Sequence, residues 1–213
     1  MKQCLMIALA VLIGVAFVAT VFSQDKVPNT GTFKDPRDGK IYKTVNIGKQ
    51  TWFTENLAYK PSSGNYSAYV KDTTNVAKYG YLYDWGTAKS VCPAGWHLPT
   101  DTEWSTLTDY LGGENVAGGK LKETGTTHWD SPNTGATNES GFTALPGGCL
   151  QLFGQFQYIG NVGRWWSSTS YKEGSKERIG DAWFRGMDAR DGKISRDSST
   201  EVAGFSVRCI RDN

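Results

Sequence analysis

Hydrophobic and polar positions alternate over two short stretches near the start of the folded part of the chain. Residues 41–47 are largely β-branched and alternate between apolar and polar, and 51–53 form a second apolar run. A period of two is typical of a β-strand, and a Gly-Lys pair at 48–49 is typical of the turn between two strands. We therefore predict a β-hairpin over these residues.

The clearest helical pattern covers residues 101–111. Thr100 and Glu103 have the spacing of a capping box, in which each side chain accepts a hydrogen bond from the other residue's backbone amide. Apolar residues then recur at i, i+3 and i+7 from Trp104, which predicts one buried helix face. Two glycines at 112–113 end the pattern. Two weaker helical segments are expected at 84–89 and 120–123.

Further short strands are expected at 81–83, 165–169, 181–185, 193–196 and 203–210. In the last of these, apolar residues ending at Cys209 alternate with polar residues ending at Arg208, which predicts one apolar and one polar face. Residues 61–78 and 124–163 lack a clear period and are predicted as loops. The pattern predicts an α+β domain of short antiparallel strands with one or two packing helices and a long irregular loop region.

The first residues differ from all the others. Lys2 is the only charge before Asp25, and an apolar run extends from Cys4 to Phe22. A charged start, an apolar run and a small residue near its end are typical of a secretory signal peptide, which we predict at 1–23. An uncleaved membrane anchor is the alternative, because the run is close to the length of a membrane span.

Cleavage is favoured because polar residues follow at once and no Lys/Arg cluster does. We then expect a linker at 24–33, one domain at 34–213 and no membrane span in the mature protein. A domain of this size can bury about 70% of the surface that its unfolded chain exposes.

Amino-acid composition narrows the range of possible functions. The 213 residues include 23 Lys and Arg against 21 Asp and Glu, a formal net charge of +2. This balance argues against a nucleic-acid-binding protein that relies on a general basic field. Aromatic residues make up 13% of the chain and 25 residues are Gly, which indicates a compact, loop-rich fold.

Three cysteines remain once the predicted signal peptide is removed: Cys92, Cys149 and Cys209. Export would permit a disulfide, and an odd number leaves at least one thiol unpaired or paired outside the chain. Cys149 is expected to be a small buried hydrophobe.

Catalytic and metal-binding motifs are not evident. The two histidines, His97 and His128, lack zinc spacing, and no Ser-His-Asp set, phosphate loop or nucleotide fingerprint occurs. We expect His97 to be structural and to bond the backbone. A structural calcium ion has no supporting motif, and polar loop filling is the preferred interpretation for its four possible ligands, Asp130, Asn133, Asn138 and Glu139. No cofactor is predicted.

A group of aromatic and arginine residues occupies the C-terminal half: Arg164, Trp165, Tyr171, Arg178, Trp183, Arg185, Arg190 and Arg196. These residue types are enriched at binding hot spots. Neighbouring Trp165 and Trp166 must point to opposite faces of a strand, and Trp166 is expected in the core. Trp52, Trp96 and Trp104 are also expected in the core. The predicted ligand-binding residues are Trp165, Tyr171, Trp183, Arg185, Arg190 and Arg196.

Several motifs resemble one known family, the Fibrobacter-type major paralogous domain. They run in the expected order over nearly the whole mature chain: Cys92-Pro-Ala-Gly-Trp-His-Leu-Pro-Thr100 followed by Glu103-Trp104, Gly141-Phe142, Trp165-Trp-Ser-Ser-Thr169 and Gly204-Phe-Ser-Val-Arg-Cys209. The hairpin with Asp38-Gly-Lys40, Gln50-Thr-Trp52 and Glu55-Asn-Leu57 is also similar to that family.

The resemblance implies an exported bacterial domain with a C-type-lectin-like fold. In such folds the N- and C-terminal strands pair, and a long loop region with the final hairpins carries any ligand site. It also implies a Cys92–Cys209 disulfide. The calcium-binding tripeptides of sugar-binding lectins, Glu-Pro-Asn, Gln-Pro-Asp and Trp-Asn-Asp, are absent. The resemblance therefore does not carry calcium-dependent sugar binding to this chain.

We expect a non-enzymatic binding or adhesion module, secreted or attached to the bacterial cell envelope. Its expected ligand is a polysaccharide or an extracellular protein. One alternative is an enzyme related to formylglycine generation, which would need a suitably placed cysteine pair. A Cys92–Cys209 bridge would leave only Cys149 and so argues against this alternative. The other is a structural envelope protein without a discrete ligand.

Overall fold

The computed structural model describes residues 29–173 and 176–212, without the side chains of 172–180. The predicted signal peptide at 1–23 lies outside this range. The strands are β1 (Asn29–Lys34), β2 (Ile41–Ile47), β3 (Gln50–Phe53), β4 (Tyr66–Ser67), β5 (Leu82–Tyr83), β6 (Trp96–His97), β7 (Gly147–Leu150), β8 (Phe156–Ile159), β9 (Val162–Glu173), β10 (Lys176–Asp188), β11 (Ser195–Thr200) and β12 (Ile210–Arg211). The helices are η1 (Tyr69–Lys71), η2 (Thr73–Asn75), α1 (Val76–Tyr79), α2 (Trp85–Ala88), α3 (Asp101–Tyr110), α4 (Glu114–Leu121) and η3 (Leu152–Gly154).

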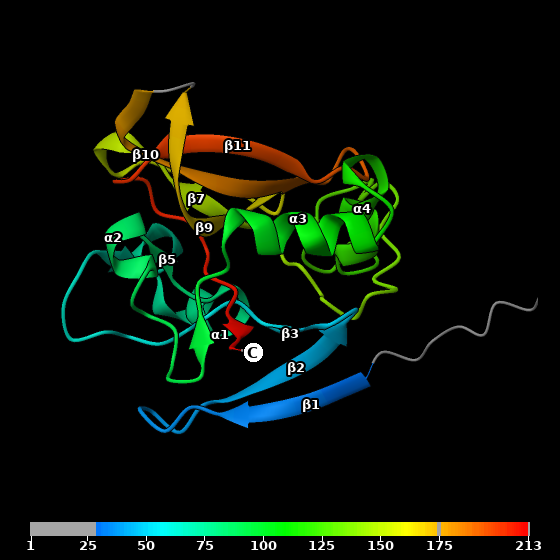
Figure 1. The fold of residues 1–213 in the computed structure, drawn as a ribbon, viewed down its shortest axis with the longest axis horizontal. Coiled ribbons are helices and arrows are strands. Elements are labelled where there is room, and N and C mark those ends of the chain that lie inside the picture. Colours follow the sequence, from blue (N-terminus) through cyan, green and yellow to red (C-terminus); the bar gives the residue numbers. More distant parts are fainter. Residues whose placement is uncertain (1–28, 174–175, 213) are drawn as a thin grey trace, which may run out of the picture.

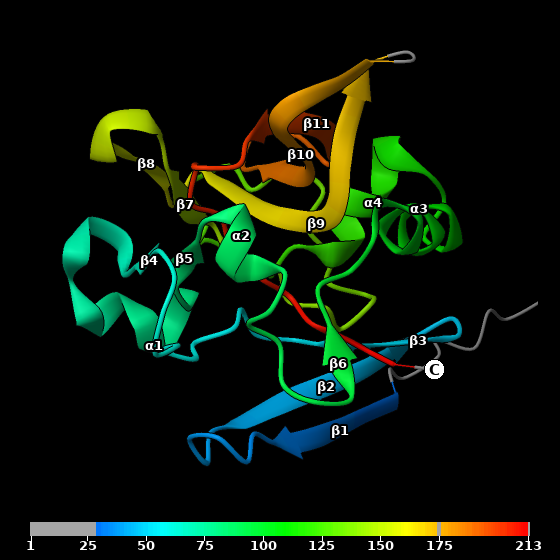
Figure 2. The ribbon, with the colours of Figure 1, turned by 60° about the vertical axis from the view of Figure 1, so that its left-hand side comes forward.

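Two five-stranded sheets and a few short helices form a mixed α+β fold (Figures 1 and 2). The first sheet has the order β1-β2-β3-β12-β6, and the second has the order β11-β10-β9-β7-β8. The second sheet is antiparallel except where β7 runs parallel to β9. In the view of Figure 1, helix α3 lies between the two sheets, and it packs against β9 and β10 of the second sheet.

The first and last strands of the described chain belong to the same sheet, with β2 and β3 between them. The C-terminal strand β12 pairs with β3 through Ile210 and Trp52, and with β6 on its other side. The hairpin predicted over 41–53 is confirmed, and its second strand pairs with the C-terminal strand, whereas the N-terminal strand β1 pairs with β2. The linker expected at 24–33 is wrong from Asn29 onward, because those residues form β1 and pair with β2 over six positions.

The helices follow their local signals unevenly. Helix α3 begins with the predicted capping box, in which the Thr100 hydroxyl accepts from the Glu103 amide and the Glu103 carboxylate accepts from the Thr100 amide. Helix α4 begins earlier than predicted. Gly118 and Gly119 weaken its helical signal, yet a Cβ at either position would come within 2.2 Å of a neighbouring backbone oxygen. Gly118 lets α4 pack directly against the loop after β10, and Gly119 lets it pack against Gly135 in the irregular segment that follows α4.

The segments predicted as loops contain short elements. Residues 61–78 hold β4, η1, η2 and the start of α1, while 124–163 holds β7, η3 and β8. The regular strand expected at 203–210, with one apolar and one polar face, is wrong. Only its last residue lies in β12, and the whole stretch is buried, Arg208 included.

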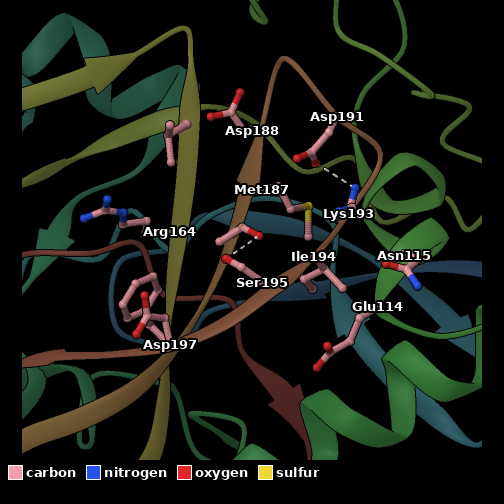
Figure 3. Close-up of a pocket in the computed structure, with 13 residues that line it drawn as sticks. Glu114, Asn115, Arg164, Met187, Asp188, Asp191, Lys193, Ile194, Ser195 and Asp197 are labelled. Atoms are coloured by element: carbon pink, nitrogen blue, oxygen red, sulfur yellow. Dashed lines mark hydrogen bonds between the residues drawn. The ribbon is translucent and has the colours of Figure 1, made fainter.

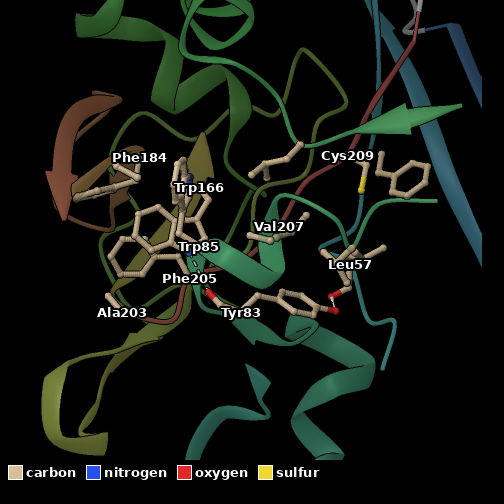
Figure 4. Packing of buried hydrophobic residues seen from close by; sticks show 14 of the residues in the cluster. Leu57, Tyr83, Trp85, Trp166, Phe184, Ala203, Phe205, Val207 and Cys209 are labelled. Carbon is tan, nitrogen blue, oxygen red and sulfur yellow. Dashed lines mark hydrogen bonds between the residues drawn. The ribbon is translucent and has the colours of Figure 1, made fainter. Parts of the chain in front are cut away.

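Strand β9 separates two hydrophobic clusters. Trp166 packs in one cluster against Phe205, with ring centroids 4.3 Å apart, and Trp165 packs in the other cluster. The two side chains point to opposite faces, as the strand period requires, but both faces are covered. Figure 4 shows the first cluster, where Trp166, Phe184 and Phe205 gather above Tyr83. The expected core positions Trp52, Trp96, Trp104 and Trp166 are confirmed.

A polar centre lies inside the fold at Arg208, whose side chain is fully buried. Its guanidinium donates to the backbone oxygen of Phe142 at 2.6 Å, to that of Phe53 at 3.2 Å and to Asn56 Oδ1 at 2.9 Å. Burial lowers the pKa of Arg208, because it disfavours the charged form. Oxygen acceptors around the guanidinium offset that cost.

Cys92 and Cys209 form the disulfide that the family resemblance implied, with Cα atoms 6.0 Å apart. The bond ties the segment before β6 to the buried C-terminal segment. Cys149 is free and buried, as expected. Burial raises the pKa of its thiol and outweighs the opposing effect of nearby Arg164, so the nucleophilic thiolate is disfavoured.

Candidate functional site

Strands β9, β10 and β11 bring together three of the six predicted ligand-binding residues. The Arg196 guanidinium lies 3.4 Å from the centroid of the Trp183 ring, and Tyr171 meets the same ring edge-on at 4.7 Å between centroids. The Trp183 and Tyr171 side chains are partly exposed. We call Tyr171, Trp183 and Arg196 the Trp183 platform.

Asp101, the first residue of α3, fixes the arginine of this platform. Its carboxylate accepts two hydrogen bonds from Arg196, at 2.8 and 3.0 Å, and one from Arg185 at 2.7 Å. Burial would raise the pKa of Asp101, but the hydrogen bonds from Arg196 and Arg185 outweigh it and lower the pKa. The platform therefore rests on a charged network anchored to a helix.

The other predicted site residues lie elsewhere. Trp165 is fully buried and donates its indole N–H to Asn56 Oδ1 at 2.8 Å, so its assignment to the ligand face is wrong. Arg185 is 2% exposed and donates to Asp101 at the start of α3. It therefore helps to hold the carboxylate that fixes Arg196, and its assignment to the ligand-binding surface is wrong. Arg190 is 75% exposed, but it pairs with Asp188 at 2.8 Å in the loop after β10. The side chain of Arg178 lies outside the described part.

A groove lies on the face of the β10–β11 hairpin opposite the Trp183 platform, because the Phe184–Asp197 pair that lines it alternates with the Trp183–Ser198 pair along the two strands. It has a volume of about 490 Å³, within the range of small-molecule sites. Its lining is Glu114, Asn115, Val162, Arg164, Phe184, Gly186, Met187, Asp188, Asp191, Lys193, Ile194, Ser195 and Asp197. Figure 3 shows that these residues come from β9, from both strands of the β10–β11 hairpin and from the start of α4. A large share of the lining is polar or charged.

The carboxylates of this groove differ in how far they are neutralised. Asp188 accepts from Arg190, and that bond outweighs burial to lower the pKa of Asp188. Asp191 accepts from the Lys193 amide and lies near buried Lys122, whose ammonium donates to three backbone oxygens, those of Thr134, Asp188 and Asp191. Glu114 and Asp197 have no cationic partner among the described residues.

Arg164 occupies one side of the groove and is surrounded by rings. Its guanidinium carbon lies 5.3 Å from the centroid of Phe184, 5.5 Å from that of Phe205 and 5.7 Å from that of Tyr158. The guanidinium donates to the sulfur of Cys149 at 3.7 Å. Sulfur is a weak acceptor, so this contact leaves most of the donor capacity of Arg164 unused.

Four side chains considered for a structural cation are engaged separately. Asp130 accepts from Asn161, Asn138 bonds Thr143, and Glu139 pairs with Lys120. Asn133 donates to two backbone oxygens, while its Oδ1 is buried without a partner. Across the described ranges, no group of three His, Cys, Asp or Glu residues is arranged to hold a metal ion.

His97 is structural, but its expected bond to the backbone is wrong. Its ring bridges the carboxylates of Asp212 at 2.6 Å and Glu103 at 2.9 Å. It thereby joins β6, the α3 cap and the chain end. Burial alone would lower the pKa of His97, but the hydrogen bonds to Asp212 and Glu103 outweigh burial and raise the pKa.

The resolved pKa shifts of the aspartates all have the same direction. All aspartates with a resolved shift, Asp35, Asp72, Asp101 and Asp188, have lowered pKa values and stay ionised. A general acid at neutral pH needs a raised carboxyl pKa instead. Of these four aspartates, Asp188 lines the groove, where it accepts from Arg190.

Sequence reasoning missed the groove. Arg164 belongs to the aromatic and arginine group but was not among the predicted ligand-binding residues, and Asp101 was predicted only as the start of a helix. Phe184, Ser195 and Asp197 were not predicted as site residues. Their common signal is the strand period, because Phe184 and Asp197 lie directly opposite each other in the β10–β11 pair and so share a face.

No helix among the described residues is long and apolar enough to cross a membrane.

Comparison with known proteins gives one family. No curated protein and no solved structure is significantly similar to this chain. The model of the Fibrobacter succinogenes major domain matches residues 45–211, from β2 to the last strand. The chain therefore belongs to the family of the Fibrobacter succinogenes major domain.

Proposed function

We propose that this protein is a non-enzymatic binding module that holds a polysaccharide on the β10–β11 hairpin. The observation that carries the proposal is the Trp183 platform: a partly exposed indole in contact with Arg196 and Tyr171, on the face of the β10–β11 hairpin opposite the polar groove. A rigid aromatic ring can stack on the apolar face of a sugar. The polar groups of the groove can hydrogen bond to sugar hydroxyls.

The proposal includes export and a C-type-lectin-like fold. The Cys92–Cys209 disulfide supports an oxidising compartment, such as the exterior or the envelope of a bacterium. Three features support the lectin-like architecture: β12 pairs with β3, α3 packs beneath β9, and residues 123–146 form a long irregular region. An experimental structure that does not superpose on lectin-like domains would remove this part of the proposal.

Cysteine chemistry supports binding over catalysis. The disulfide leaves Cys149 as the one thiol of the described chain, and burial raises the pKa of that thiol. A formylglycine-generating relative would need a reactive cysteine pair. A peptide substrate incubated with the protein would gain no aldehyde under the proposal, and formation of one would overturn it.

Retention on polysaccharides tests the proposal directly. A glycan array and a pull-down with insoluble polysaccharides are expected to show binding, and Trp183→Ala is expected to lower affinity at least tenfold. Tyr110→Ala is the matched control, because Tyr110 is an exposed aromatic residue on α3 outside the hairpin. Binding to no glycan, or unchanged affinity in folded Trp183→Ala, contradicts the proposal.

A surface protein is the second candidate ligand, favoured by the tip of the β7–β8 hairpin. Phe153 is 98% exposed there and Leu152 is 46% exposed. Exposed aromatic residues of this kind act as anchors at protein interfaces. If the ligand is a protein, Phe153→Ser abolishes adhesion to protein-coated surfaces, whereas Trp183→Ala leaves adhesion unchanged.

A further inference from the structure

We propose that Arg164 makes the groove selective for acidic sugars, by binding the carboxylate of a uronic acid residue. The inference rests on the proposed polysaccharide binding and adds the chemical class of the ligand. It also adds a site that the predicted ligand-binding residues did not include.

The first step is the isolation of the Arg164 guanidinium from oxygen. The other buried or paired arginines of the described chain donate to carboxylate, amide or backbone oxygens: Arg37, Arg185, Arg190, Arg196 and Arg208. Arg211 has no such acceptor among the described residues, but its side chain is exposed to solvent. Within residues 29–173 and 176–212, no oxygen accepts from Arg164, although its side chain is partly buried. A partly buried charge without a strong acceptor is costly, and an incoming oxygen pair would satisfy it.

The second step is the shape of the acceptor that fits. A guanidinium presents parallel N–H donors that match the two oxygens of a carboxylate. The surrounding rings of Phe184, Phe205 and Tyr158 lower the local dielectric, which strengthens such a pair. The ligand therefore needs a planar anionic group at this position.

The third step is the rest of the ligand. Asp197 lies opposite Phe184 in the β10–β11 pair and Ser195 lies opposite Gly186, so both share the groove with Arg164. Asp197 has no cationic partner among the described residues and can accept hydrogen bonds from sugar hydroxyls. The lack of a side chain at Gly186 leaves room for the Ser195 hydroxyl in the groove, because a Cβ there would come within 2.6 Å of the hydroxyl oxygen.

The fourth step is a place for a sugar ring. Tyr158 is 49% exposed, and its ring lies beside the Arg164 guanidinium. A pyranose ring stacked on Tyr158 would direct its carboxylate toward Arg164. A carboxylate, several hydroxyls and an apolar ring face together describe a hexuronic acid unit.

Calorimetric titration with trigalacturonate, a glucuronate-bearing oligosaccharide and the methyl ester of trigalacturonate tests the inference. We expect the wild-type protein to bind an acidic probe at least tenfold more tightly than the ester. Arg164→Gln removes that preference and leaves weak ester binding unchanged. Arg164→Lys is intermediate, because an ammonium is a point charge and cannot form the parallel pair. Asp197→Ala weakens the acid and the ester alike.

Arg211→Gln is the matched control, since it removes the same charge from an exposed position in the other sheet. We expect its affinity to stay within twofold of wild type. Equal wild-type affinity for acid and ester overturns the inference, and so does an unchanged preference in folded Arg164→Gln. The wild-type comparison decides even if that variant misfolds. Binding of neutral glycans alone refutes the inference and leaves the proposed function standing, whereas binding of no glycan refutes both.

Discussion

Arg208 and Arg164 lie beside aromatic rings in the same small domain, yet their surroundings are opposite. The Arg208 guanidinium is 4.4 Å from the centroid of Phe142 and is enclosed by backbone and amide oxygens. The Arg164 guanidinium borders a groove, and its one acceptor within the described chain is the sulfur of Cys149. A buried cation with oxygen acceptors holds the fold together, whereas a cation without them is available to a ligand.

The interior around Arg208 depends most on the Cys92–Cys209 disulfide. The bond spans 117 residues and fixes the segment that carries Arg208. In the chain-entropy model a loop of this length contributes on the order of 4–5 kcal/mol. We expect the double variant Cys92→Ala, Cys209→Ala to lose about this much free energy of unfolding, measured by urea denaturation. Cys149→Ala is the control, and equal losses in both would contradict the account.

Arg208→Met gives the next largest expected effect. The variant takes the guanidinium donor away from the buried backbone oxygens of Phe53 and Phe142, and it leaves Asn56 Oδ1 with the Trp165 indole donor alone. Unpaired buried polar groups cost about 1–3 kcal/mol each, so we expect a loss of about 3–4 kcal/mol in the free energy of unfolding. Arg211→Met, at an exposed position, is expected to change it by less than about 0.5 kcal/mol. A similar loss of unfolding free energy in both variants would contradict the structural role assigned to Arg208.

The His97 bridge provides a smaller effect that depends on pH. Hydrogen bonds to Asp212 and Glu103 raise the pKa of His97 in the folded state, so the folded protein binds this proton more tightly than the unfolded chain. Its stabilisation is fully present below the ordinary histidine pKa of about 6.5 and is lost as pH rises through the folded value.

Melting temperatures of wild type and His97→Gln test this sign. The stability advantage of wild type is expected to be larger at pH 5.5 than at pH 8.5. We expect at most about 1 kcal/mol, because both carboxylate partners are partly exposed to solvent. An advantage that grows with rising pH would contradict the assignment.

Arg164→Met is expected to have the smallest effect on folding. No oxygen of the described chain loses a donor, so we expect the free energy of unfolding to change by less than about 0.5 kcal/mol. The same substitution at Arg208 and at Arg164 therefore gives opposite outcomes in urea denaturation. A loss at Arg164 as large as that at Arg208 would make both arginines structural.

Local signals in the sequence predict the parts of the fold that local contacts determine. The α3 cap needs only Thr100 and Glu103, and the hairpin at 41–53 needs only a strand period and a turn. The family resemblance adds the disulfide, which local pattern alone left open. Helix α4 was misplaced because Gly118 and Gly119 serve close packing at the cost of helical propensity.

The burial of charged and aromatic side chains depends on distant partners, and sequence spacing does not show these. Arg208 meets Phe53, which is 155 positions away, and Arg185 meets Asp101, which is 84 positions away. The strand period correctly turned Trp165 and Trp166 apart, but it could not show that a core cluster covers each face of β9. The same limit concealed the groove, which forms only when β9, β10, β11 and α4 meet.

The central claim is that Arg164 binds a carboxylate. A crystal structure of the wild-type protein with trigalacturonate tests it most directly. The account predicts a uronate carboxylate with both oxygens within about 3 Å of the Arg164 guanidinium nitrogens and a sugar ring against Tyr158. A carboxylate bound at Arg190 or Lys193, with Arg164 still facing only Cys149, would contradict it.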